Sequence, residues 1–151
     1  MKAAIFQVFL AAVIALCFAV VFNVRGRKLV VSTIGGAVVW TIYLAFRALS
    51  GSMFVGIFVA AGLTALLSEL LARKMRAPVT VFLVPSLLPL FPGGDLYYAA
   101  ASLVRGDGSF GAAATLVLKE AGAIAGGIIV AATLVQAYYR IRFALRRRAR
   151  S

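Results

Sequence analysis

The chain has 151 residues, of which 64% are hydrophobic and only 13% are charged, and its mean hydropathy is +1.04. This composition lies outside the range of soluble globular domains and predicts one integral membrane domain. The net charge of +12 comes from Lys and Arg residues in short clusters between apolar runs. That pattern is typical of orientation signals rather than of a nucleic-acid-binding surface, so we expect no nucleic-acid partner.

The reactive side chains are too few for a typical enzyme. Histidine is absent, the single cysteine lies inside an apolar run, and the acidic residues are Glu69, Asp95, Asp107 and Glu120. The sequence contains no phosphate-binding loop, no nucleophile motif and no metal-ligand spacing. It therefore predicts a protein that is not an enzyme and that uses no cofactor or metal.

Apolar runs long enough to cross a bilayer follow one another along the chain. Residues 3–22 contain one polar side chain, Gln7, and span about 30 Å as a helix. This run is long for a signal peptide and a basic cluster follows it, which favours its retention as a first crossing. Further runs cover residues 29–46, 53–71, 79–104 and 121–139. We expect an all-α integral membrane protein with about five transmembrane helices in residues 1–139 and a basic cytoplasmic tail in residues 140–151.

Most Lys and Arg residues follow the first, third and fifth of these runs. Cytoplasmic loops are enriched in these residues, so the pattern predicts an outside N-terminus and a cytoplasmic C-terminus. Tyr138 and Tyr139 beside Arg140 are expected to anchor the last crossing at the membrane interface.

Small residues recur at a spacing of four on several runs. Such faces let helices approach closely in lipid, either within one chain or against a second chain. They comprise Ala11, Ala15 and Ala19, then Gly56 and Ala60, then Gly122 and Gly126.

The run over residues 79–104 differs from a plain membrane anchor. Pro85, Pro89 and Pro92 lack amide donors, and Gly93 with Gly94 provides the backbone freedom for a turn. We therefore expect two half-helices, with the fourth transmembrane helix broken near the membrane midplane. Unpaired backbone groups at that depth are costly unless protein, water or ligand satisfies them, so the break is expected to line a cavity.

Asp95 follows this break, and two roles remain open for it. It stands where an N-cap residue belongs, and its carboxylate can accept the first amides of the second half-helix. A carboxyl group at the bilayer centre can equally serve as a proton or cation site. Elsewhere, Glu69 lies four residues before Arg73 and predicts an ion pair on a helix surface, whereas Glu120 is expected at the membrane interface.

Most of the chain resembles the threonine/serine exporter (ThrE-like) family, and specifically its small, YjjB-type subunit. The resemblance runs from residue 23 to residue 131, through NVRGRKLV, LLSELLARKMRAPVTVFLVPSLLPLFPGGDLYYAA, LVRGDGSFGAAATL and AGAIAGGIIVA. It implies a bacterial inner-membrane exporter of small polar carboxylate metabolites, namely threonine and serine or dicarboxylates such as succinate, driven by the proton motive force. It also implies a larger homologous ThrE-like membrane subunit as partner, related to this chain as an inverted repeat.

The resemblance identifies Pro89, Pro92, Gly93 and Gly94 as the family's broken-helix motif, from which Asp95 departs. Helix N-termini attract anions, so we expect the second half-helix to bind a substrate carboxylate. The predicted site comprises Pro89, Pro92, Gly93, Gly94, Asp95, Leu96 and Tyr97. The alternative is a non-transporting accessory or scaffold subunit, which needs small-residue faces but no broken helix.

Overall fold

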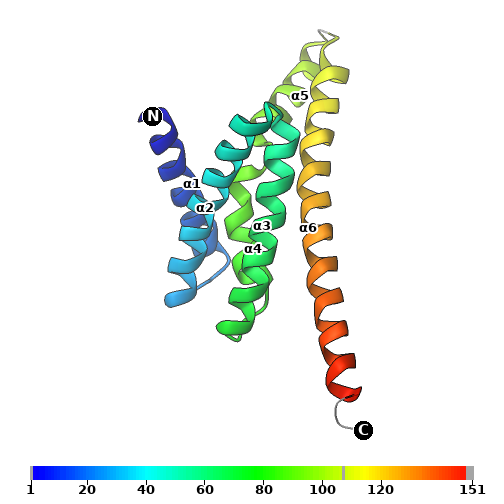
Figure 1. Ribbon diagram of the computed structural model, residues 1–151. Coiled ribbons are helices and arrows are strands. Elements are labelled where there is room, and N and C mark those ends of the chain that lie inside the picture. The colour runs from blue at the N-terminus through cyan, green and yellow to red at the C-terminus, as the bar shows by residue number, and fades with distance from the viewer. Residues whose placement is uncertain (1, 107, 149–151) are drawn as a thin grey trace.

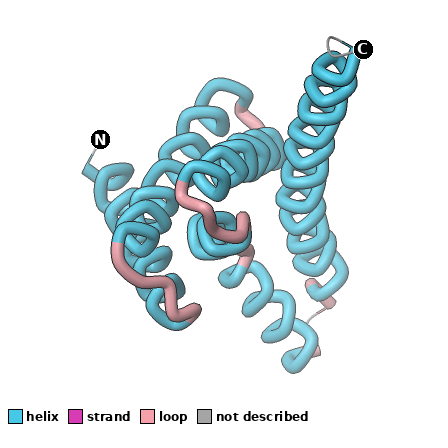
Figure 2. Tube along the Cα trace, turned by 90° about the horizontal axis from the view of Figure 1, so that it is seen from below, coloured by secondary structure: helices cyan, strands magenta, loops and turns pink. Residues whose placement is uncertain are grey.

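A computed structural model describes residues 2–106 and 108–148, and this part of the chain consists of helices joined by short turns. The helices are α1 (Lys2–Val21), α2 (Arg27–Ser50), α3 (Met53–Lys74), α4 (Thr80–Leu87), the 3-10 helix η1 (Leu88–Leu90), α5 (Gly93–Arg105) and α6 (Phe110–Arg148). The first four form a bundle, α6 runs along α3, and α5 extends past one end of the bundle beside the start of α6 (Figure 1). Figure 2 shows α6 at one side of this group of helices.

Four of the helices are long and apolar enough to cross a membrane. They are α1, α2, α3 and the part of α6 over Phe110–Ile141. The expected crossing at residues 79–104 is divided among α4, η1 and α5, and none of these reaches the necessary length alone. The all-helical membrane class is therefore confirmed, and the count of five crossings stays a prediction. α6 passes through position 140 without interruption, so the expected tail continues the helix as far as Arg148.

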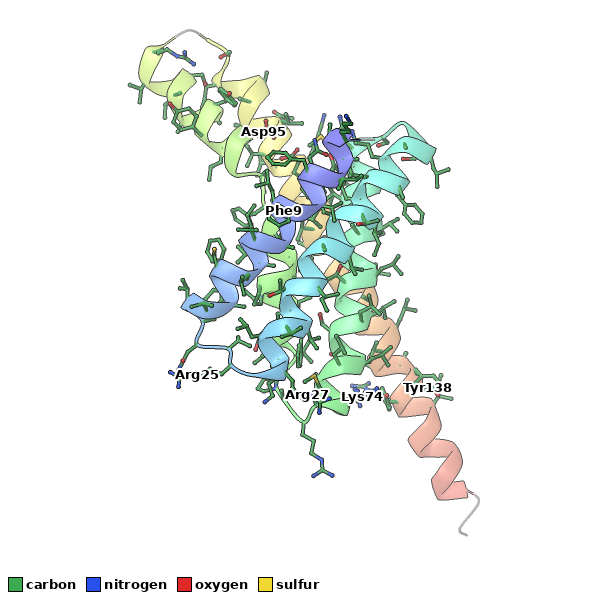
Figure 3. All side chains as sticks on the ribbon, turned by 90° about the vertical axis from the view of Figure 1, so that its left-hand side faces the viewer. Phe9, Arg25, Arg27, Lys74, Asp95 and Tyr138 are labelled. Carbon is green, nitrogen blue, oxygen red and sulfur yellow. The ribbon has the colours of Figure 1, made fainter. Side chains whose placement is uncertain are left out.

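The basic clusters gather at one end of the molecule. Figure 3 shows Arg25, Arg27 and Lys74 at the same end of the bundle, together with Tyr138 on α6. α1 starts at the opposite end and α6 finishes beyond the basic end (Figure 1). The chain thus enters and leaves the bundle at opposite ends, as an odd number of passes requires.

Arg73 links α3 to α6 at this basic end. Its guanidinium lies 3.4 Å from the carboxylate of Glu69, which confirms the ion pair that the four-residue spacing predicted. Its central carbon also lies 3.6 Å from the ring centroid of Tyr139 on α6, a cation–π contact.

Small residues set the closest contact between α1 and α2. Ala11, Ala15 and Ala19 are buried, as their spacing predicted. A Cβ atom placed on Gly36 of α2 would collide with Ala15 and lie 2.8 Å from the carbonyl oxygen of Ala11. The backbones approach this closely only because the contacting side chains are so small.

The contact between α3 and α6 falls at a different glycine from the predicted pair. A Cβ on Gly127 would collide with the carbonyl oxygen of Phe58 and lie 2.9 Å from the amide nitrogen of Gly62. Gly126 packs on the ring of Phe58, whereas Gly122 faces open space. The closest backbone approach therefore includes Gly127, one residue beyond the GxxxG pair.

A buried apolar cluster connects four elements at the centre of the molecule. It joins α2, α3, η1 and α6, and consists of Val39, Tyr43, Ile57, Ala60, Ala61, Leu90 and Ala123.

Candidate functional site

Pro85 interrupts the hydrogen bonding of α4 from within. Proline has no amide hydrogen, so the carbonyl of Val81, four residues earlier, loses its helical donor. The hydroxyl of Ser32 on α2 donates to this carbonyl oxygen at 3.1 Å, and Ser86 in turn donates to the carbonyl oxygen of Ser32 at 3.3 Å. The two helices touch here, because a Cβ on Gly35 would collide with the Ser86 hydroxyl. The hydroxyl of Ser32 thus replaces the amide donor that Pro85 removes from the first part of the break.

The second part of the break separates η1 from α5. Phe91 has an extended backbone, with φ of −66° and ψ of 132°, and the buried Pro92 is the N-cap of α5. The helix restarts at Gly93, whose amide donates to the carbonyl oxygen of Phe91 at 2.7 Å. Asp95 is the third residue of α5 and not its N-cap, and the N-cap position makes no side-chain hydrogen bond.

Asp95 lies near one end of the bundle and not at its middle. Figure 3 shows Asp95 near the end of the bundle at which α1 begins, far from Arg25, Arg27 and Lys74. The reason is that α4 and η1 run away from the end at which Lys74 lies, so α5 starts only after they have passed part of the way along the bundle (Figure 1).

The predicted site residues lie on different surfaces. Pro89 lines a hollow of about 170 Å³ together with Gln7 of α1 and Trp40 of α2. Tyr97 lines a separate, shallower hollow on the outer side of α5, of about 460 Å³. These two hollows have no predicted site residue in common.

The glycines at the start of α5 face open space. No atom of the described chain comes within 4 Å of a Cβ placed on Gly93 or Gly94. Leu96 and Tyr97 are also exposed, the latter to 69%. Another molecule can therefore approach the backbone of this turn without colliding with side chains.

Glu120 of α6 is buried among the helices of the chain. Only 3% of the residue is exposed, whereas its neighbour Lys119 is exposed. Within the described part of the chain no hydrogen-bond partner reaches either of its carboxylate oxygens. The charged group that interacts with it is the carboxyl of Asp95 on α5.

A further hollow, of about 330 Å³, lies between α2, α3 and α4. Its walls are largely apolar, with the hydroxyl-bearing residues Thr64, Ser68 and Ser86 among them and Lys74 at its edge. The hydroxyl of Thr64 is buried and has no hydrogen-bond partner in the described part of the chain. Such a hollow can accept a small molecule or an acyl chain, and hydroxyl groups are its main polar feature.

The sequence matches one family model over residues 7–137, namely that described as Threonine/Serine exporter, ThrE. The chain belongs to the threonine/serine exporter family. The matched region of this exporter-family chain includes most of α1, the whole of α2 to α5 and most of α6. No curated protein and no solved structure matches the chain. The family, together with the long apolar helices, assigns the chain to membrane transport and to export.

Sequence reasoning missed two features of this exporter-family chain. Glu120 lies three residues before Ala123, a member of the core cluster, so the two share a helix face, and this spacing was a usable signal. Thr64 and Ser86 line the same hollow only because α3 packs beside α4, and no local pattern predicts that arrangement.

Proposed function

We propose that this chain is one subunit of a secondary transporter that exports small polar carboxylate metabolites, namely threonine and serine or dicarboxylates such as succinate. A larger homologous membrane subunit is its partner, and the proton gradient drives export. The observation that supports the proposal is the family match, which extends over residues 7–137 and so includes all or most of each described helix.

In this proposal the membrane is crossed five times, with α4, η1 and α5 together forming the fourth crossing. Arg25, Arg27 and Lys74 at one end of the bundle support a cytoplasmic position for that end. The N-terminus then lies outside and the C-terminus in the cytoplasm of a bacterial inner membrane. The termini at opposite ends of the bundle are consistent with this topology.

The substrate carboxylate binds at the first turn of α5. A helix N-terminus carries unpaired amides and a partial positive charge, which favour an anion. Gly93 and Gly94 leave this turn open, so a substrate can reach the backbone directly. Pro89 and Pro92 hold the preceding chain out of helical geometry, and Leu96 and Tyr97 flank the site.

The larger subunit completes the site by covering the outer side of α5 and the start of α6. This surface consists of large apolar side chains that no other helix of the chain covers. They include Tyr97, Leu103, Val104, Leu116 and Leu118, of which Val104 is 88% exposed. A second chain in this position would shield a bound metabolite from lipid.

The accessory-scaffold alternative rested on small-residue faces that were free to bind another protein. In the structure, contacts inside this chain occupy several of these positions, such as Ala15 against Gly36 and Gly126 against Phe58. Their presence therefore no longer favours a scaffold over a transporter.

The experiment is metabolite release from cells that express this chain, the larger subunit, both, or neither. Loading with threonine, serine or succinate and following external metabolite over time should show release above background only when both subunits are present. Release by this chain alone would contradict the proposed pairing, and release by the larger subunit alone at the full rate would favour an accessory role.

A further inference from the structure

Glu120 is an ionisable side chain inside a helix that is long enough to span a membrane. It lies in the apolar stretch Phe110–Ile141 of α6, and only 3% of the residue is exposed. No hydrogen-bond donor of the described chain reaches either carboxylate oxygen. An ionisable group in such a position is costly to keep, and in membrane proteins it usually marks a functional site.

The partner of Glu120 is another acid. α5 and α6 run antiparallel, joined by a short turn, and this pairing places the first turn of α5 beside the eleventh residue of α6. Asp95 is the acidic side chain that interacts with Glu120, and two carboxyl groups can form a hydrogen bond with each other only when one of them holds a proton. When both are ionised neither can donate, which is why Glu120 has no partner among the described groups.

Among the interactions described, no basic side chain pairs with Glu120. α3 packs on α6, but its ionisable residues Glu69, Arg73 and Lys74 lie at the other end of the bundle from Glu120. Glu69 and Arg73 pair with each other there. On α5, the titratable side chains besides Asp95 are Tyr97 and Tyr98, which are exposed, and Arg105. Arg105 lies about 15 Å further along the helix than Asp95. On α6 itself, Lys119 points outward and is exposed.

Two acidic side chains on packed helices, with no basic partner among the described groups, repel each other when both are ionised, and a proton held between them relieves that repulsion. A metal cation is a poorer fit, because hard cations take six or more oxygen ligands and two carboxyl groups do not supply them.

We infer that Asp95 and Glu120 together bind one proton, and that this shared proton is the one that couples transport to the proton gradient. The inference rests on the proposed export function and adds to it the residues of the coupling site. Glu120 lies about 27 Å along α6 from Tyr138, nearly the thickness of the hydrocarbon core. In the proposed orientation the pair therefore sits toward the outer side, where it takes a proton from external water while the metabolite leaves.

The test labels the full chain, together with its larger partner in liposomes, with dicyclohexylcarbodiimide, which reacts with protonated carboxyl groups in apolar surroundings. Mass spectrometry should find the adduct on Glu120 or Asp95, decreasing as the pH rises, and not on Glu69, which is paired with Arg73. Absence of labelling on both acids at every pH would overturn the inference. Protection by added sodium at constant pH would also overturn it, since the pair would then bind sodium.

Transport measurements complete the test. Glu120→Gln should leave metabolite movement down its own gradient but abolish the stimulation by an imposed pH gradient, whereas Lys119→Gln at the neighbouring exposed position should keep that stimulation. Full stimulation in Glu120→Gln and in Asp95→Asn would contradict the coupling role. Labelling of Glu120 does not depend on transport, so a labelled chain that exports nothing would refute the export function and leave the proton site in place.

Discussion

The hydroxyl of Ser32 on α2 donates a hydrogen bond of 3.1 Å to the carbonyl oxygen of Val81 on α4, which is the carbonyl that Pro85 leaves without its helical donor. Ser32→Ala should therefore leave a buried acceptor unsatisfied. We expect the free energy of unfolding to fall by about 1–3 kcal/mol, measured by denaturant titration in detergent micelles. Adding Pro85→Ala restores an amide to the chain, so the double variant should lose less than Ser32→Ala alone.

The control for this prediction is Thr41→Ala in the same helix. Thr41 is exposed and its hydroxyl donates to the carbonyl of Ala37, which already belongs to α2, so its loss should have little effect. Equal losses in Ser32→Ala and Thr41→Ala would show that the contact across the two helices has no special importance.

Gly127→Ala should separate α3 from α6. The added methyl group would collide with the carbonyl oxygen of Phe58, and overpacking of this kind costs about 1–3 kcal/mol in the free energy of unfolding. Gly122→Ala, on the same helix but facing open space, is the matched control and should be neutral or slightly stabilising. A larger loss from Gly122→Ala than from Gly127→Ala would mean that the predicted GxxxG pair, and not Gly127, makes the close contact.

The topology prediction can be tested with reporter fusions on either side of α6. A reporter inserted after Arg105 should be active on the outer side of the membrane, and one fused after Ser151 should be active in the cytoplasm, because the basic clusters favour the inside. The reverse pattern would mean that the chain has the opposite orientation in the membrane. The same compartment for both sites would rule out a crossing between them.

Gly94→Val tests the open turn at the start of α5. A Cβ atom at this position has open space around it, so the variant should fold and be inserted normally. It should nevertheless abolish export, since the added bulk stands where substrate or the larger subunit approaches the backbone. Gly111→Val is the matched control, because Gly111 is likewise the second residue of its helix and faces open space. Export at the normal rate by Gly94→Val would exclude this turn as the binding site.

Local sequence patterns predicted most of the fold but not the pairing of its acids. Hydropathy located α1, α2, α3 and α6, and the spacing of Ala11, Ala15 and Ala19 identified a buried face, because both signals lie within one helix. The depth of Asp95 and the burial of Glu120 depend on how α5 folds back against α6. Neither helix contains that information by itself, so the carboxyl pair became visible only in three dimensions.

The most direct test of the account is efflux from liposomes that contain this chain and its larger partner. The liposomes are loaded with labelled threonine, serine or succinate, and a pH gradient, acidic outside, is then imposed. We predict release of at least one of these metabolites that requires both subunits and that slows when the gradient is dissipated. No release of any of the three by a correctly assembled complex would contradict the assignment of this chain to metabolite export.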